Sequence, residues 1–270
     1  MKGDYLDAAI EAARRAGSII IRNLGLLARG DIIRKQAADF VTRVDTEAEK
    51  AIIDTIRERF PDHAFSFLAE ESAQSGDFQP AENNEKAGLW IIDPLDGTTN
   101  YIHGYPCFSV SIALQAGGEI VAGAVLDPVR DELFTAEKGR GAHLNGKRLS
   151  VSAFPLPDAV IATGFPFRNR ELTRDYLRVF ENIFSRVSDL RRAGSAALDL
   201  ASVASGRCDG YFEARLKPWD IAAGSLLVRE AGGIVSDWTG GEDFLRTGNI
   251  VASPSHLHAG LIKEIRAVFG

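Results

Sequence analysis

An apolar run that leads directly into two acids constrains this chain more than any other segment. Residues 89–92 have the length and composition of a buried strand, and residues 93–97 (Asp-Pro-Leu-Asp-Gly) follow at once. The proline and the glycine predict a tight reversal of the chain at the tip of that strand. Asp93, Asp96 and a peptide carbonyl between them would then converge on one hard cation, because Mg²⁺ prefers a small octahedron of oxygen ligands. Taken alone, the segment is equally typical of an ordinary exposed turn.

Two further acidic positions stand at the boundaries of predicted elements. Residues 65–69 are typical of a short buried strand, and they run into Glu70 and Glu71. Asp220 opens a predicted helix at 221–231, where an N-cap or first-turn acid would lie. Each acid by itself is as typical of a solvated strand end or a simple helix cap. Three acidic sites at strand ends and helix starts are together the arrangement in which open α/β sheets assemble ligands, so we favour a metal site.

Several segments jointly resemble one enzyme family. Residues 70–72 (Glu-Glu-Ser), 90–101 (Trp-Ile-Ile-Asp-Pro-Leu-Asp-Gly-Thr-Thr-Asn-Tyr) and 218–224 (Pro-Trp-Asp-Ile-Ala-Ala-Gly) resemble the signature motifs of the inositol monophosphatase family, in particular its bacterial members. Residues 192–200 and 230–233 resemble that family as well. The similarity extends from the first predicted helix to the last. The combination is specific, although each piece alone is not.

The resemblance implies an α/β fold of the sugar-phosphatase type, with five layers in the order α-β-α-β-α. A single catalytic unit would span 1–270, with a metal-site half at 1–153 and a substrate-side half at 154–270. The chain of 270 residues with 45% hydrophobic content can bury a core of that size. Strand-like and helix-like pieces alternate from about residue 155 onward, which favours a second α/β half. In the absence of repeats or low-complexity linkers, we expect the halves to pack tightly around the active site.

Hydrophobic periodicity predicts the main helices. Apolar residues recur at helical spacing from residue 6 to residue 24, which indicates one long amphipathic helix. A second helix is predicted after Asp45, with a capping box formed by Thr46 and Glu49 and a stop at Pro61. Two more helices are expected at 174–185 and 195–205.

The strand pattern is equally regular. Residues 108–114 and 120–126 flank the pair Gly117-Gly118 and predict an antiparallel hairpin, which 133–136 extends. Short strands are also expected at 160–163 and 210–212. These elements place the acids described above at the ends of buried strands.

The chemistry of phosphate ester hydrolysis suits such acids. The reaction needs charge neutralisation, an activated water and a stabilised leaving group, and two metal ions about 3.5–4 Å apart supply all three. The resemblance implies that Glu70, Asp93 and the carbonyl of Leu95 hold a first Mg²⁺. It further implies that Asp93, Asp96 and Asp220 hold a second one, with Asp93 bridging both.

The same resemblance implies the catalytic residues Glu70, Thr98 and Asp93. Glu70 and Thr98 would position and deprotonate the attacking water, with the Thr98 hydroxyl passing a hydrogen bond between acid and nucleophile. A turn-capping hydroxyl is the alternative for Thr98. Gly97 and Thr98 would offer backbone N–H groups to phosphate oxygens if a helix begins there.

Substrate contacts are also carried over from the family. Gly194, Ser195, Ala196 and Glu213 would face the sugar hydroxyls, since a buried site that hydrogen-bonds a hydroxyl rejects analogues without it. A surface acid at a strand end is the alternative for Glu213. The substrate-binding set implied by the resemblance comprises these four residues together with Asp96, Gly97, Thr98 and Asp220.

Two features near the predicted site have alternatives that the sequence alone does not decide. Lys35, Asp39 and Asp45 lie where the family has a mobile loop near a third, weaker metal, and ordinary surface charges are the alternative. Ala69 stands where the family usually has glycine before the two glutamates. Alanine would be strained there if the backbone adopts positive φ, although an extended strand tolerates it.

Composition excludes several other classes. The net charge of −6 argues against wholesale binding to nucleic acid or membranes, and no apolar stretch approaches the length of a membrane span. The N-terminus lacks the apolar block of a signal peptide, so we expect a cytoplasmic enzyme. Cys107 and Cys208 are far apart and are expected to be buried apolar residues, without a disulfide or a structural zinc.

The function predicted from these residues is Mg²⁺-dependent hydrolysis of a phosphorylated sugar or cyclitol, with inositol 1-phosphate as the first candidate, by a homodimer. Fructose-1,6-bisphosphate, histidinol phosphate and a 3′-phosphonucleotide are alternative substrates. A Ser-His-Asp hydrolase is not supported, because none of the five histidines lies near a Gly-x-Ser-x-Gly elbow. A regulatory protein that binds RNA or a transcription component is the alternative class, since the pairs Arg14-Arg15 and Arg191-Arg192 form small basic clusters.

Overall fold

Two β-sheets form the framework of this computed structural model, which describes residues 2–36, 39–63, 65–73 and 88–270. One sheet is seven-stranded and parallel only between its first two strands, with neighbours in the order β3 (Ser66–Ala69), β4 (Leu89–Asp96), β5 (Ser109–Ala116), β6 (Glu119–Asp127), β7 (Glu132–Glu137), β8 (Gly141–Leu144) and β9 (Lys147–Arg148). The other is five-stranded, in the order β11 (Asp189–Arg191), β10 (Val160–Thr163), β12 (Gly210–Glu213), β14 (Ile250–Ser253) and β13 (Ile234–Ser236).

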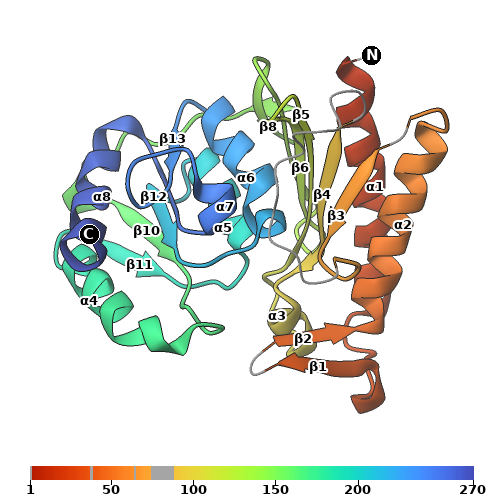
Figure 1. The fold of residues 1–270 in the computed structure, drawn as a ribbon, viewed down its shortest axis with the longest axis horizontal. Helices are drawn as coiled ribbons and strands as arrows, with labels where there is room; N and C mark the ends of the chain where they lie inside the picture. Colours follow the sequence, from red (N-terminus) through yellow and green to blue (C-terminus); the bar gives the residue numbers. More distant parts are fainter. Residues whose placement is uncertain (1, 37–38, 64, 74–87) are drawn as a thin grey trace.

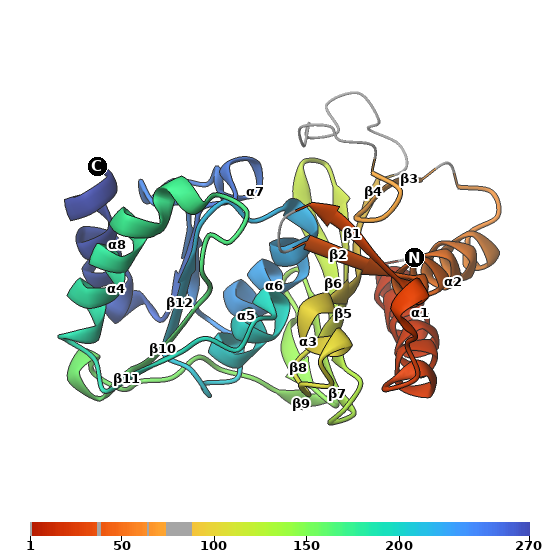
Figure 2. The ribbon, with the colours of Figure 1, turned by 90° about the horizontal axis from the view of Figure 1, so that it is seen from below.

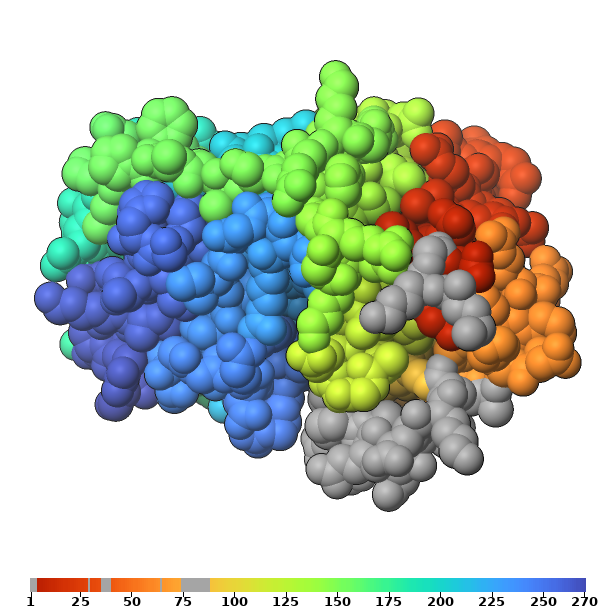
Figure 3. Space-filling view, turned by 90° about the horizontal axis from the view of Figure 1, so that it is seen from above, coloured from red at the N-terminus to blue at the C-terminus, as the bar shows by residue number. Residues whose placement is uncertain are grey.

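Helices cover both sheets and separate them. Figure 1 shows α1 (Lys2–Asn23) and α2 (Arg43–Arg59) on the outer face of the seven-stranded sheet, α5 (Ala196–Ala204) and α6 (Pro218–Glu230) between the sheets, and α4 (Thr173–Phe184) and α8 (Ser255–Phe269) beyond the five-stranded sheet. On the face shown in Figure 3, the C-terminal half meets the yellow-green part of the N-terminal half along a continuous seam. The predicted α/β fold with layers α-β-α-β-α is therefore confirmed.

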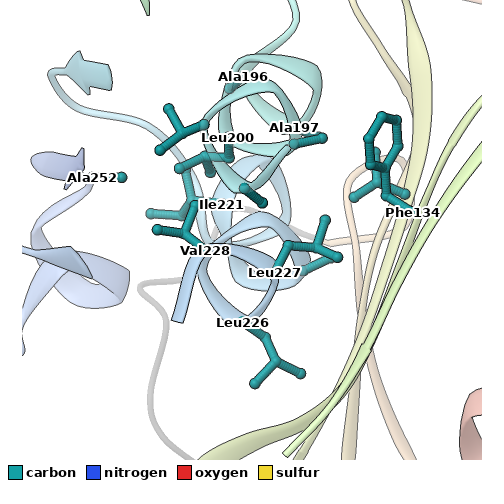
Figure 4. Close-up of a cluster of buried hydrophobic side chains, with 14 of the residues drawn as sticks. Phe134, Ala196, Ala197, Leu200, Ile221, Leu226, Leu227, Val228 and Ala252 are labelled. Atoms are coloured by element: carbon teal, nitrogen blue, oxygen red, sulfur yellow. The ribbon is translucent and has the colours of Figure 1, made fainter. Parts of the chain in front are cut away.

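The middle layer holds the two sheets together. Figure 4 shows Leu200 of α5 and Leu227 of α6 between Phe134 of β7 on one side and Ala252 of β14 on the other, and all four are buried. Burial of a side chain the size of leucine contributes about 1.5–3 kcal/mol. Since both faces of α5 and α6 are apolar, these helices belong to the cores of both sheets.

Several short elements complete the fold. Figure 2 shows the hairpin of β1 (Ile32–Gln36) and β2 (Asp39–Thr42) beside the short helix α3 (Thr98–Ile102). The remaining elements are η1 (Arg29–Asp31), η2 (Leu156–Asp158), η3 (Arg170–Leu172) and α7 (Phe244–Thr247). Among the described helices, none combines the length and the apolar character that a membrane crossing requires.

Most of the elements predicted from periodicity are present. The N-terminal helix, the hairpin of β5 and β6, its extension by β7 and the helices α4 and α5 lie within a few residues of the expected ranges. The two cysteines are free and buried, as expected, and burial raises the pKa of each thiol to about 12.

The capping box predicted for the second helix was wrong by one turn. The N-cap is Thr42: its hydroxyl oxygen accepts from the N–H of Val44 at 3.1 Å, and Asp45 accepts from the N–H of Thr42 at 2.9 Å. The chain enters α2 directly from β2, so the helix begins before Thr46. Glu49 instead accepts from the N–H of Glu71 at 2.7 Å.

The predicted reversal at 93–97 was also wrong. β4 continues through these residues to Asp96, which pairs with Ser109 of β5, and the register shifts between Asp93 and Asp96. A bulge of this kind accommodates Pro94, which cannot donate to a regular ladder. The chain leaves the sheet only at Gly97, whose φ of 93° and close approach to the carbonyl of Cys107 require glycine.

Candidate active site

One cavity of about 240 Å³ is lined by residues from both halves of the chain. Every site residue predicted from the sequence lines this cavity except Ser195. The predicted residues on its wall are Glu70, Asp93, Leu95, Asp96, Gly97, Thr98, Gly194, Ala196, Glu213 and Asp220.

Strand pairing explains why the acids meet. β3 runs parallel to β4 with Ala69 opposite Ile92, so Glu70 emerges beside Asp93. The N–H of Glu70 donates to the carbonyl of Ile92 at 3.1 Å and continues the pairing. Asp220 lies in the first turn of α6, as predicted, and its carboxylate accepts from the N–H of Lys217 at 2.7 Å. The acids thus reach one cavity from three separate elements.

The acids of this cluster raise one another's pKa values. Burial raises the pKa of Asp93 well above its ordinary value, and the charges of Glu70, Asp96 and Asp220 raise it further. Burial and then Asp220 raise the pKa of Asp96 to about 7. Burial also raises the pKa of Asp220, whereas the nearby Arg168 lowers it. The cavity therefore concentrates negative charge that favours a cation.

Asp96 is held by the opposite half of the chain. Its Oδ2 accepts from the Ser195 hydroxyl at 2.6 Å and from the N–H of Ala197 at 2.9 Å, both at the start of α5. Ser195 is 1% exposed, and it also contacts the Ser109 hydroxyl at 3.2 Å. The resemblance assigned Ser195 to the substrate-binding set; in the structure its hydroxyl donates to Asp96, and Ser195 does not line the cavity.

Thr98 is paired differently from the sequence-based expectation. Its hydroxyl lies 3.1 Å from a carboxylate oxygen of Asp45 and 3.0 Å from the carbonyl of Leu95, so Asp45 and not Glu70 is its acidic partner. Asp45 is fully buried in the first turn of α2, and burial raises its pKa. An ordinary surface charge is therefore excluded for Asp45. The side chains of Lys35 and Asp39 lie outside what the structure describes.

Glu213 ends β12 and is 6% exposed, which excludes the alternative of a surface acid. Its Oε2 accepts from the Tyr211 hydroxyl at 2.7 Å. Burial raises the pKa of Glu213 to about 7, with a further contribution from Asp220. Ala69 lies at the end of β3 and is not among the described residues with positive φ, so alanine in place of glycine causes no strain there.

Several lining residues have no signal in the sequence. Phe40 comes from β2, while Phe167 and Arg168 come from the loop after β10. The Arg168 guanidinium lies 4.9 Å from the centre of the Phe167 ring and 3.9 Å from Glu70. Arg192 also lines the cavity, and only its place at the start of the 192–200 motif could have indicated it.

The family model for inositol monophosphatases matches residues 2–268. This chain belongs to the inositol monophosphatase family. The Nus factor SuhB of Escherichia coli strain K12 is 47% identical over 262 residues, which cover 97% of this chain and 95% of that protein.

Solved structures of the family agree with the fold. The extragenic suppressor protein suhB from Bartonella henselae is 44% identical with a TM-score of 0.89, over 97% of this chain and 98% of that one. The inositol monophosphatase from Anabaena is 39% identical with a TM-score of 0.83, over 98% of this chain and 96% of that one. The resemblance noted in the sequence is thereby confirmed.

The donor chemistry of this family member fits a hard divalent cation. Among the described residues, no three His, Cys, Asp or Glu side chains already lie close enough together to enclose an ion. Glu70, Asp93, Asp96 and Asp220 nevertheless line one cavity and raise the pKa of Asp93 by their proximity. An all-carboxylate set of this kind matches Mg²⁺ and not a soft metal.

Proposed function

We propose that this family member hydrolyses the phosphate monoester of a sugar or cyclitol, with inositol 1-phosphate as the first candidate, in a Mg²⁺-dependent reaction. The acid cluster around one cavity supports this most directly. Glu70, Asp93 and the carbonyl of Leu95 would hold one Mg²⁺, while Asp93, Asp96 and Asp220 would hold a second. When bound, Mg²⁺ neutralises phosphate charge and makes a water more acidic.

Thr98 and Asp45 are the proposed proton-handling pair. The Thr98 hydroxyl donates to Asp45 and leaves its oxygen lone pairs available to accept from an attacking water. Asp45 is held in place by Thr42, whose hydroxyl donates to it at 2.6 Å. Glu70 would orient the same water from the opposite side of the cavity. The proton would pass from the water to Thr98 as Thr98 passes its own proton to Asp45.

The C-terminal half would bind the alcohol part of the substrate. Glu213, Gly194 and Ala196 line that side of the cavity, and the Glu213 carboxylate would accept from a sugar hydroxyl. The backbone N–H groups of Gly97 and Thr98 would contact the phosphate oxygens on the other side. This division follows the two halves at 1–153 and 154–270, which remain a proposal, as does the homodimer.

A phosphate-release panel tests the proposed function. Its substrates are inositol 1-phosphate, glycerol 2-phosphate, fructose-1,6-bisphosphate, histidinol phosphate and 3′-phosphoadenosine 5′-phosphate, each with Mg²⁺ and after exhaustive chelation. We expect turnover that requires Mg²⁺ and is fastest with inositol 1-phosphate. A different ranking would assign another substrate, and full turnover after chelation would contradict the metal site.

A second candidate function is association with the transcription machinery in the cytoplasm. It is favoured by the name of the 47% identical relative, Nus factor SuhB. Binding to RNA or to a transcription complex should weaken steeply as salt rises. Fluorescence anisotropy with labelled RNA at physiological salt tests it, with Asp93→Asn as a control that removes hydrolysis but not surface binding. Absence of binding to RNA and to transcription complexes would exclude this role.

A further inference from the structure

The carboxylate of Glu213 occupies the space that the Cβ atom of a larger residue at position 164 would take. β10 and β12 are parallel with Thr163 opposite Phe212, so the next residues along each strand, Gly164 and Glu213, are neighbours. A Cβ atom on Gly164 would lie 2.1 Å from Cδ and from both carboxylate oxygens of Glu213. The φ angle of Gly164 is not in the left-handed region. A side chain at this position would therefore force the Glu213 carboxylate to shift, whereas the backbone conformation itself does not call for glycine.

Tyr211 holds the same carboxylate from within its own strand. It lies two residues before Glu213, so both side chains project from one face of β12. Tyr211 is fully buried, and its hydroxyl donates to Oε2 of Glu213 at 2.7 Å. Because the Tyr211 ring is held in place by the residues packed around it, its hydrogen bond restrains the position of the Glu213 carboxylate. Gly164 thus allows the position of Glu213, and Tyr211 fixes it.

The second carboxylate oxygen is left for a ligand. Oε1 of Glu213 takes part in none of the hydrogen bonds formed among the described residues. The side chain is more than nine-tenths buried, and the surface that it keeps lines the cavity. Oε1 is not one of the fully buried atoms without a partner, so it is open to the cavity. A hydroxyl group of a bound ligand would pair with it, whereas a ligand that displaced water without supplying a hydroxyl would leave it unpaired at a cost in free energy.

We propose that Gly164 and Tyr211 are positioning residues that fix Glu213 so that Oε1 selects phosphate esters whose alcohol part carries a further free hydroxyl. The selected class is phosphorylated polyols, and esters of alcohols without such a hydroxyl are disfavoured because Oε1 then stays unpaired. This inference rests on the proposed function. In this proposal, selection between substrates depends on Gly164 after β10 and Tyr211 of β12 as well as on Glu213.

The test compares two substrates in the full chain. kcat/KM is measured with Mg²⁺ for inositol 1-phosphate and for para-nitrophenyl phosphate, which has no free hydroxyl, and the ratio of the two values is the readout. Gly164→Ala should displace the carboxylate and lower this ratio about tenfold, mainly through KM for the polyol. Tyr211→Phe should lower it by a smaller factor. Gly260→Ala is the matched control, because no atom lies within 4 Å of the added methyl group.

A double-mutant comparison shows whether the effect passes through Glu213. Glu213→Gln should lower the ratio by itself, and adding Gly164→Ala to it should then change the ratio less than about twofold. The inference would be overturned if Gly164→Ala left the ratio unchanged. It would also be overturned if Gly164→Ala lowered the ratio equally in the wild type and in the Glu213→Gln variant. If a thermal melting curve shows that Gly164→Ala does not fold, the same double-mutant comparison is made with Tyr211→Phe, and its result is judged by the same criteria. Inactivity of the wild type on both substrates would instead refute the proposed function, and this inference with it.

Discussion

The two walls of the cavity differ in the charges that they carry. The wall from the N-terminal half presents Glu70, Asp93 and Asp96 and, among its described lining residues, no basic side chain. The wall from the C-terminal half presents Glu213 and Asp220 together with Arg168 and Arg192. The acids of the first wall therefore depend on a cation or on groups that reach across the cavity. The second wall balances its own charge and is suited to an organic group.

The largest effect is expected from Asp93→Asn. Asp93 would contact both metal ions, so turnover should fall by more than roughly 10⁴-fold in a phosphate-release assay. Without metal, burial and three neighbouring acids disfavour the ionised form of Asp93, and asparagine has no such form, so the melting temperature in chelator should rise by about 2–4 °C. Near-normal activity, or a lower melting temperature in chelator, would show that the first wall does not need a cation.

Thr98→Ala comes next and tests the pairing with Asp45. If Thr98 passes a proton from water to Asp45, kcat should fall roughly 10²–10⁴-fold with little change in KM. Asp45→Asn should reproduce that loss, because asparagine keeps the cap on Thr42 but accepts a proton poorly. A metal titration is the control. Full recovery of kcat at high Mg²⁺ in either variant would mean that the pair serves metal binding and not the water.

Ser195→Ala should have a smaller effect, because it removes one contact between the walls. Asp96 then loses its 2.6 Å hydrogen bond and becomes less well oriented. We expect about a tenfold higher Mg²⁺ concentration at half-maximal activity, which is typical of residues that orient metal ligands. Ser109→Ala is the matched control, since it keeps the backbone pairing of Ser109 with Asp96 and removes a hydroxyl that contacts Ser195 and not the Asp96 carboxylate. Equal shifts in both variants would contradict a specific link to Asp96.

The smallest predicted effect is a difference in pH response between the two halves. His258 in α8 is 8% exposed between the hydroxyls of Ser236 and Ser253, and burial lowers its pKa below 6.5. The unfolded chain then binds more protons, so stability is full above about pH 6.5 and is lost as the pH falls through the lower folded pKa. The acids of the cavity act in the opposite direction, because their folded pKa values are raised.

Thermal melting in chelator between pH 7.5 and 5 measures this difference. The wild type should lose more stability on acidification than His258→Gln, whose side chain does not titrate. The buried acids are common to both proteins, so the difference between the two curves isolates His258. If the melting temperatures of the two proteins changed in parallel with pH, His258 would be excluded as the source of acid sensitivity.

Local sequence patterns predicted the acids well but not their partners. Asp93, Asp96 and Asp220 follow from short motifs, because each acid ends or begins an element that its own neighbours define. The pairing of Thr98 with Asp45 and of Asp96 with Ser195 joins residues 53 and 99 positions apart, so no local pattern reveals it. The bulge at Pro94 was missed for a related reason, since β5 supplies the pairing that keeps those residues in the sheet.

The apolar middle layer has a consequence for dividing this protein into fragments. α5 and α6 are buried along nearly their whole length, and both come from the chain after residue 154. A break between β9 and β10 would leave the N-terminal fragment with one sheet face in water and the C-terminal fragment with two apolar helices exposed. We expect neither piece to be soluble alone and the two to recover a native fold when expressed together. We therefore expect the two large sheets to fold as one cooperative unit, which would make the chain a candidate for split-protein complementation and not for domain dissection.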